Sequence, residues 1–413
     1  MFSIDKEWSL LEEIGFIRVG GSEEELKAAK IIQKYLKDLG LKSKLEHFDV
    51  KMSEKREATL EVTKPYKKEY KCSVFMNSAD VDELEAELVY VDSYNEVSLK
   101  EIKGKVVLVN GYVGAIAYDK FIKYNPAAFI SFNGEIDFPE SFDLAERELR
   151  EPLHDAKIIP GINILVSDAM DIVKNHATKV KITTKQKEVK AESTNVICDI
   201  KGYEGKQTIC FTAHYDSVPE SKGYYDNGTG AVSLYSLAEY FSQHQPRHNV
   251  RFIFTGSEER GLLGSKAYVK KHQKELEDTA LCINVDMIGS ILGNFISVAT
   301  ADNSLVNFID YYGKMNGISI DSRQGVYSSD STPFADSGVP AVSFARITPH
   351  GAGQIHCRYD VIEHLSKDQL QIDTEIICKI SDLFVNSYVV PVPKEMPQNM
   401  KDDLDKYLGR KAK

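Results

Sequence analysis

The chain reads QTICFTAHYD from Gln207 to Asp216 and NVRFIFTGSEE from Asn249 to Glu259. Each stretch is an unbroken apolar run that ends in histidine or acidic side chains. The same pattern recurs in TNVICDI (194–200) and in ALCINVDMIG (280–289). Such unbroken apolar strands are typical of a parallel sheet whose two faces are both covered.

Amphipathic helices are predicted between and around these strands. Apolar residues recur at helical spacing in residues 22–39, 228–242, 262–274 and 366–388. This alternation predicts an α/β fold with a mostly parallel sheet and helices on both faces.

A β-rich insert is predicted between the first helix and the strand series. Residues 51–190 contain KMSEKREATLEV, ELVYVD and GKVVLVNG, which alternate or run as short strands. A length of 413 residues also exceeds that of a usual single domain. We therefore expect one domain from residues 1–50 and 191–390, an inserted domain over 51–190, and a C-terminal tail over 391–413. The charged end of this tail, KDDLDKYLGRKAK (401–413), is expected to fray or pack loosely.

The composition excludes some classes of partner. A formal net charge of −11 argues against nucleic acid, because a polyphosphate requires a basic face. We expect no membrane span, since no apolar run reaches the length needed. The N-terminal segment lacks the features of a secretion signal, and the six scattered cysteines are typical of reduced, buried thiols, so we expect a cytoplasmic protein.

The residues that directly follow the apolar strands are rich in metal-ligand types. In open α/β sheets ligands bind at the carboxyl ends of the strands. His214 and Asp216 follow one strand, Glu258 and Glu259 the next, and Asp286 a third. Asp226 precedes the helix near Gly228, and His356 follows the strand PAVSFA after a loop.

A metal centre explains this set better than separate roles do. Any one of these residues could cap a helix, make a turn or face solvent. Acidic groups that converge at one sheet edge would repel each other without a cation among them. Histidine and carboxylate ligands without cysteine suit zinc, manganese or cobalt in a catalytic site, and two metals sharing a carboxylate would balance the charge.

The motifs resemble a known peptidase family. They are HYD (214–216), GYYDNGTG (223–230), GSEERGLLGS (256–265), NVDMIG (284–289), SSDSTPF (328–334) and IHCRYD (355–360). In this order they resemble the co-catalytic di-zinc aminopeptidases, a family that also contains glutamate carboxypeptidase and glutaminyl cyclase. The opening segment IRVGGSEEELKAAKIIQKYLKDLGL resembles that family's first helix, and the insert resembles a protease-associated domain.

The resemblance implies a zinc exopeptidase fold and a role for each residue. It implies that Asp226 bridges two divalent metal ions, which we expect to be zinc. His214 and Asp286 would hold one ion, and Glu259 and His356 the other. Glu258 would be the general base, and Asp216 would orient His214. The implied activity is removal of N-terminal residues from a peptide substrate.

The sequence departs from the family near the last ligand. Ile355 stands where members often have a tyrosine that stabilises the transition state, and Cys357 follows where Thr or Ser is common. Tyr327 could replace that tyrosine or lie in a solvated loop. His350 is an alternative ligand to His356, and Asp330 either supports the site or caps a helix.

Other functions remain open on the same scaffold. A carboxypeptidase would need a cation for the substrate's carboxylate, for which Arg346 or Arg358 could serve. A cyclase would hold one zinc, and a non-catalytic receptor-like binding protein would be expected to have lost ligands. The insert could restrict access, recognise peptide or build the interface of a homo-oligomer.

Overall fold

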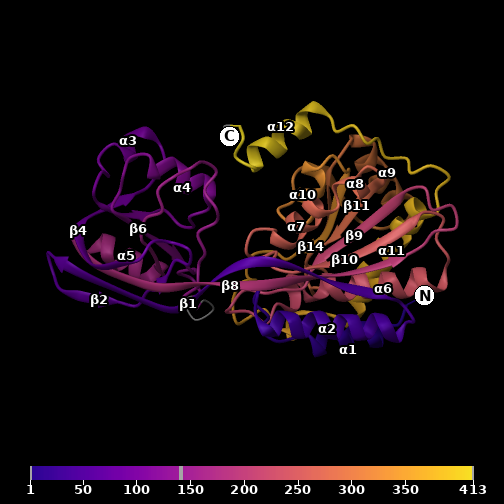
Figure 1. Cartoon of the computed structure of the whole chain (residues 1–413), viewed down its shortest axis with the longest axis horizontal. Coiled ribbons are helices and arrows are strands. Elements are labelled where there is room, and N and C mark those ends of the chain that lie inside the picture. Colours follow the sequence, from indigo (N-terminus) through magenta and orange to yellow (C-terminus); the bar gives the residue numbers. More distant parts are fainter. Residues whose placement is uncertain (1, 139–142, 412–413) are drawn as a thin grey trace. The chain divides into compact units, whose positions relative to one another are not determined.

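Strands β1 (Ser43–Lys64) and β8 (Lys179–Ile200) each contain a boundary between two units of the fold. The computed structural model describes residues 2–138 and 143–411. The first unit holds the chain up to Val50 and from Glu192 onward, and the second holds Lys51–Ala191 (Figure 1).

The sheet of the first unit is mostly parallel, as the sequence predicts. Its strand order is β13-β12-β14-β11-β9-β10-β8. The strands not yet bounded are β9 (Thr208–His214), β10 (Asn249–Thr255), β11 (Thr279–Val285), β12 (Asn294–Thr300), β13 (Asp321–Gln324) and β14 (Ala341–Ile347). β9 runs parallel to both β10 and β11, and β11 runs parallel to β14. The antiparallel pairs are β10 with β8 and β12 with β14.

Both faces of this sheet are buried. In β9, Ile209, Phe211 and Ala213 belong to one apolar cluster, whereas Cys210 belongs to another. Successive side chains of a strand point to opposite faces, so these clusters lie on the two sides of the sheet. This burial explains why β9, β10 and β11 read as unbroken apolar runs instead of alternating.

Helices cover each face, as Figure 1 shows. One cluster includes residues of α1 (Ile4–Glu13), α2 (Glu23–Asp38), α6 (Thr229–Gln243), α9 (Asn303–Asn316) and α11 (Lys367–Val385). The other includes residues of α7 (Leu263–Lys271), α8 (Gln273–Leu276) and α10 (Ser331–Asp336). Helices α2, α6 and α11 agree with the prediction. The helix predicted over 262–274 is interrupted at His272, and α1 and α9 are additional.

The C-terminal segment packs more closely than its sequence suggests. Helix α12 (Gln398–Tyr407) buries Met400 and Leu404, and Leu404 belongs to the same cluster as α7 and α10. The expectation that residues 401–413 fray or pack loosely is therefore wrong for the part that lies in this helix. Its two apolar residues lie four positions apart on one helix face, among charged neighbours that hide the pattern.

The strands of the second unit pair in the order β8-β4-β5-β6-β7-β3. Its strands are β2 (Lys68–Tyr70), β3 (Ser73–Val74), β4 (Val81–Val91), β5 (Val106–Val109), β6 (Ala128–Asn133) and β7 (Gly161–Leu165). Helices α3 (Glu96–Leu99), α4 (Ala115–Ile122) and α5 (Val166–Lys174) accompany them. β4, β5, β6 and β7 pair in parallel. The likeness of this unit to a protease-associated domain remains a prediction.

Two expectations concern the chain as a whole. Across residues 2–138 and 143–411, no helix combines the length and the apolarity that a bilayer crossing requires. The cysteines are free thiols, and all are buried except Cys72, which is partly exposed.

Candidate metal centre

The predicted ligands lie at one edge of the first unit's sheet. His214 is the last residue of β9, Glu258 and Glu259 follow β10, and Asp286 follows β11. These strands are parallel, so their carboxyl ends meet at the same edge. Asp226 lies in the irregular turn η2 (Tyr224–Gly228) before α6, and its peptide bond to Asn227 is cis. His356 comes from the loop after β14.

Asp226 lies at the centre of the cluster. Its Oδ1 atom is 3.2 Å from Nε2 of His214, and its Oδ2 atom is 3.1 Å from Nε2 of His356. The same Nε2 atom of His356 is 2.9 Å from Oε2 of Glu259. On the other side, Nε2 of His214 is 3.7 Å from Oδ1 of Asp286. The five predicted ligands thus form two groups that share one carboxylate.

The donor set fits divalent cations. His214, Asp226 and Glu259 each offer one ligand atom, and these atoms lie within 4.8 Å of one another. Within the described residues, Oε1 of Glu259 and Oδ1 of Asp286 are buried without a hydrogen-bond partner. Buried carboxylate oxygens without a partner are costly, and a cation would satisfy them. The His356 side chain is 41% exposed, so the centre is open to solvent on that side.

The charges of the cluster respond strongly to one another. Burial alone would lower the pKa of His214, but the surrounding carboxylates, first that of Glu258, raise it well above its usual value. Burial would raise the pKa of Asp226, but its contacts with His214 and His356 lower it. Protons on the histidines would therefore offset the acidic charge wherever no cation does so.

Glu258 and Glu259 point in different directions. Oε2 of Glu258 is 3.9 Å from Nε2 of His214, whereas Glu259 faces His356. Burial raises the pKa of Glu258 well above its ordinary value, against the opposing charge of His214. A carboxylate with a raised pKa, beside the ligands but outside their closest contacts, can accept a proton from water.

Asp216 holds the turn that carries both glutamates. Its Oδ1 and Oδ2 atoms accept hydrogen bonds from the main-chain N–H groups of Glu258 and Glu259, at 2.9 and 3.3 Å. Its Oδ1 atom also lies 3.5 Å from Nδ1 of His214, and that nitrogen has no hydrogen-bond partner within the described residues. Asp216 therefore positions the Glu258–Glu259 turn as well as lying next to His214.

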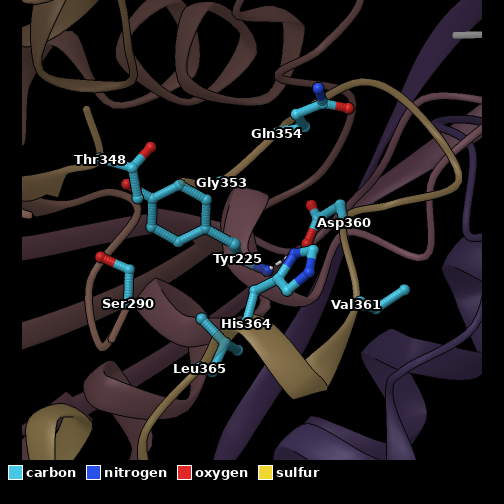
Figure 2. A pocket seen from close by; sticks show the side chains of 9 residues that line it. All are labelled: Tyr225, Ser290, Thr348, Gly353, Gln354, Asp360, Val361, His364 and Leu365. Atoms are coloured by element: carbon cyan, nitrogen blue, oxygen red, sulfur yellow. Dashed lines mark hydrogen bonds between the residues drawn. The ribbon is translucent and has the colours of Figure 1, made fainter. Parts of the chain in front are cut away.

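Asp360 plays a similar part at Asp226, which the sequence analysis did not predict. Its carboxylate accepts hydrogen bonds from the main-chain N–H groups of Tyr225, at 2.7 Å, and Asp226, at 3.1 Å. Figure 2 shows Asp360 beside Tyr225 in the wall of a small pocket. Burial raises the pKa of Asp360 to about 7. The only sequence signal was its position at the end of the IHCRYD motif.

The structure decides between the alternatives that the sequence left open for His350, His356 and Asp330. His356 contacts Asp226 and Glu259, whereas His350 is exposed. Asp330 precedes α10, yet its side chain makes no capping hydrogen bond; instead it accepts one from the Thr255 hydroxyl. Burial raises the pKa of Asp330 to about 6.

Tyr327 is not a solvated loop residue. Within the described residues, its hydroxyl oxygen is buried without a hydrogen-bond partner. Burial raises the pKa of Tyr327, and the charges of Asp286 and Asp226 raise it further. The phenol therefore keeps its proton, and the negative charges of the cluster act on it.

The backbone around the site adopts strained conformations. Ser257, Met287 and His356 have positive φ angles of 52°, 60° and 56°. Left-handed backbone is uncommon for residues other than glycine, and such residues gather at functional sites where surrounding contacts hold them. Two of these residues adjoin predicted functional residues, Glu258 and Asp286, and the third is itself a predicted ligand.

Comparison with known proteins agrees with this geometry. The model of peptidase family M28 matches residues 195–381, which include the five predicted ligands and Glu258. Over these residues the chain is similar to peptidase family M28. Among curated relatives, the aminopeptidase YwaD of Bacillus subtilis is 29% identical over 389 residues, covering 88% of this chain and 80% of the relative. An aminopeptidase of Pseudomonas aeruginosa is 29% identical over 162 residues, covering 36% of this chain and 30% of the relative.

Solved structures share the fold over nearly the whole chain. The zinc aminopeptidase BSAP from Bacillus subtilis has a TM-score of 0.77 at 23% identity, covering 97% of this chain and 99% of that one. The aminopeptidase from Aneurinibacillus sp. strain AM-1 has a TM-score of 0.75 at 22% identity, covering 95% and 96%. At these identities the likeness establishes the fold, and the α/β prediction is confirmed.

Proposed function

We propose that this chain is a zinc metallo-aminopeptidase, a hydrolase that removes the N-terminal residue of a peptide. The observation that carries the proposal is the placement of Asp226, whose two oxygens face two different histidines at 3.2 and 3.1 Å. The names of its relatives YwaD and BSAP support the same activity.

The ligands would divide between two ions. His214 and Asp286 would hold one ion, Glu259 and His356 the other, and Asp226 both. When bound, two zinc ions would lower the pKa of a water and polarise the scissile carbonyl. The charges would also balance better, because the buried carboxylates would face cations instead of each other.

Glu258 moves the proton in this scheme. Its carboxylate takes a proton from the attacking water and passes it to the leaving amine. Its raised pKa suits this task, because the protonated acid must persist until the amine departs. Asp216 keeps Glu258 in place through the main-chain N–H of that residue, at 2.9 Å.

Tyr327 would supply the hydrogen-bond donor that a tyrosine at position 355 gives in many family members. Its hydroxyl is buried without a partner within the described residues, so no existing contact must break before it donates. A donor aimed at the carbonyl oxygen stabilises the negative charge that develops there.

The charge of the site favours a free amino terminus over a free carboxylate. In its unprotonated form Glu258 adds negative charge beside the acidic ligands, and this charge attracts a cationic amine. A carboxypeptidase would instead need an available cation. Arg346 is held in a two-pronged pair by Asp373, with Nε and Nη2 donating at 2.8 and 2.7 Å. The other candidate, Arg358, is exposed and stacks on the Tyr359 ring at 5.9 Å.

Metal content and end-group dependence test the proposal together. Freshly purified protein should contain about two equivalents of zinc per chain. It should hydrolyse a panel of aminoacyl-anilides, fail on their N-acetyl forms, lose activity on chelation and regain it with zinc. One equivalent would favour a cyclase, and cleavage only of N-blocked peptides with a free carboxylate would favour a carboxypeptidase. Absence of both metal and turnover would leave a binding protein.

We also propose that residues 51–190 form a protease-associated-like domain and that this domain can build the interface of a homo-oligomer. We further propose that the enzyme acts in the cytoplasm. The parallel order of β4 to β7 supports a separate sheet-based domain. Light scattering on purified full-length protein tests the oligomer, and fractionation of cells tests the location. A single-chain mass or an exported protein would contradict the respective statement.

A further inference from the structure

Residues 16–25, which run from the loop after α1 into the first turn of α2, contact the turns on which the metal centre is built. This segment, residues 16–25, lies about 200 positions before the first ligand in the sequence. None of its residues was among the predicted site residues. Two of its side chains, Arg18 and Glu25, reach different turns of the centre, and both are buried.

Arg18 donates hydrogen bonds to both ends of the loop between His214 and Asp226. Its guanidinium donates to the main-chain carbonyls of Tyr215, Lys222 and Gly223, the last at 2.7 Å, and to that of Phe16 at 3.1 Å. Its own main chain exchanges hydrogen bonds with Ser217, at 3.1 and 3.2 Å. Residues 215–223 make up most of the chain between His214 and Asp226. Arg18 therefore contacts both ends of the loop that sets the distance between these two ligands.

The burial of this cation needs an explanation. Within the described residues, the guanidinium donates to carbonyl groups and pairs with no carboxylate. Burying a charge without an ion pair is expensive, so such a residue persists only if the surroundings compensate. The carboxylates whose charges favour the cation are Asp360, Asp216, Asp226 and Glu259, which are residues of the metal centre and its supports. Arg18 and the acidic cluster thus stabilise each other.

Glu25 holds the residue before the general base. Its Oε1 atom accepts hydrogen bonds from the main-chain N–H of Ser257, at 2.9 Å, and from the hydroxyl of Ser193, at 2.7 Å. Ser257 has a φ angle of 52° and directly precedes Glu258. A serine in this left-handed conformation needs such contacts to stay there, because the conformation is unfavourable for residues other than glycine.

Gly20 lets the segment approach this turn closely. A Cβ atom at Gly20 would come within 2.2 Å of the Ser257 hydroxyl oxygen and 2.7 Å of the Ser257 Cα. The main chains of the segment and of the turn before Glu258 are therefore in direct contact. A shift of the segment would move the Glu258 turn.

We propose that the 16–25 segment positions the metal centre through two separate contacts. Arg18 sets the spacing of His214 and Asp226 and so the affinity for zinc. Glu25 sets the position of Glu258 and so the turnover of the zinc-loaded enzyme. Both are positioning residues that act through the main chain of others. The second statement rests on the proposed function, whereas the first concerns metal binding alone.

Zinc affinity tests the role of Arg18 without any assay of activity. We expect Arg18→Met to weaken zinc binding by about 10- to 100-fold, the range found when groups that support metal ligands are removed. Arg18→Lys keeps the charge but cannot reproduce the planar fork of donors, so its affinity should fall between that of Arg18→Met and that of the native protein. The measurement is competition with a chromophoric chelator on metal-free protein whose fold is checked by circular dichroism.

Arg323→Met is the matched control, because Arg323 is half exposed and lies away from the site on β13. Zinc affinity equal to that of the control in folded Arg18→Met would overturn the role of Arg18. If Arg18→Met does not fold, native zinc affinity in Arg18→Lys would overturn it as well.

Kinetics of the zinc-loaded enzyme test the role of Glu25. Glu25→Ala should lower kcat by about 10²-fold, because a displacement of about 1 Å at a reacting group has that effect. KM and zinc content should change much less than kcat, since Glu25 contacts neither the ligands nor the substrate directly. Glu25→Gln should restore much of kcat, because its amide oxygen can still accept from Ser257.

Glu24→Ala is the control, since Glu24 is the exposed neighbour on the same helix. Equal kcat in Glu24→Ala and Glu25→Ala would overturn the role of Glu25, and so would loss of zinc in step with kcat. If the native protein binds zinc but cleaves no peptide, the proposed function is wrong. The zinc affinity of the Arg18 variants then still tests whether Arg18 positions the metal ligands.

Discussion

The Oδ2 atom of Asp226 lies 3.1 Å from Nε2 of His356. The other oxygen of this carboxylate faces His214 at 3.2 Å, so one side chain connects two histidines that lie 142 positions apart in the sequence. Asp360 and Asn227 hold the turn around Asp226: Asp360 accepts from the Asp226 N–H, and Asn227 donates to the Val285 carbonyl next to Asp286. The turn therefore joins both halves of the centre.

Replacing Asp226 by alanine should release zinc from both halves. We expect less than about one equivalent per chain to remain after dialysis, against about two in the native protein, because the bridging ligand serves both ions. Elemental analysis of dialysed protein measures this. The exposed Asp321→Ala serves as the control. Retention of the full zinc content would remove Asp226 as the shared ligand.

Replacing Glu258 by glutamine should separate metal binding from turnover. The amide has nearly the same shape but cannot take a proton from water, so kcat should fall by about 10²- to 10⁴-fold. Zinc content should be unchanged, because Glu258 is outside the five predicted ligands. The assay is hydrolysis of an aminoacyl-anilide alongside elemental analysis. Native turnover with full zinc would show that another group is the base.

Replacing Tyr327 by phenylalanine should lower kcat by about 10²-fold or more, the usual effect of removing a donor to the developing oxyanion. Zinc content and thermal stability should change little, since the hydroxyl has no protein partner within the described residues to lose. Tyr311→Phe on α9 is the matched control, with Tyr311 60% exposed. Equal kcat in the two variants would exclude a catalytic role for the phenol.

Replacing Glu7 by glutamine should make the protein more stable at alkaline pH. Glu7 is fully buried between α1, α6 and α11, where Ser236 and Thr374 donate to its carboxyl group at 2.8 and 2.9 Å. Burial raises its pKa from 4.5 to about 8. Between these values the folded state holds a proton that the unfolded state has lost, so the stability that this group contributes falls as pH rises.

The glutamine side chain does not titrate in this range. The variant should therefore lose the part of the pH dependence of stability that comes from Glu7. The free energy of unfolding of Glu7→Gln, relative to the native protein, should rise by a few kcal/mol between about pH 5 and pH 8. Urea unfolding at both pH values measures it, with the exposed Glu12→Gln on the same helix as the control. Parallel pH profiles for Glu7→Gln and the native protein would contradict the assignment.

The ligands at strand ends could be predicted because their positions depend on local pattern. His214, Glu259 and Asp286 each follow an apolar strand, and parallel strands bring their carboxyl ends to one edge of the sheet. His356 was harder, since it comes from a loop, and the choice between it and His350 needed the family motif. The fold class followed from the same alternation of strands and helices.

The supporting residues could not be predicted from pattern. Arg18 and Glu25 act on main-chain groups of Tyr215, Gly223 and Ser257, and a main-chain group carries no signature of its residue type. Helix α12 shows a different limit. Its apolar pair Met400 and Leu404 was present in the sequence, but two apolar residues among charged ones do not distinguish a packed helix from a solvated tail.

The amino-acid sequence by itself determined which strands and helices form and which ligand types stand at their ends, because strand and helix periods are local properties of the chain. The tertiary structure alone decided that each oxygen of Asp226 faces a different histidine, and that Arg18 and Glu25 reach the turns beside them. The direction of a loop side chain depends on contacts with residues hundreds of positions away, and those contacts exist only once the sheet and its helices have packed.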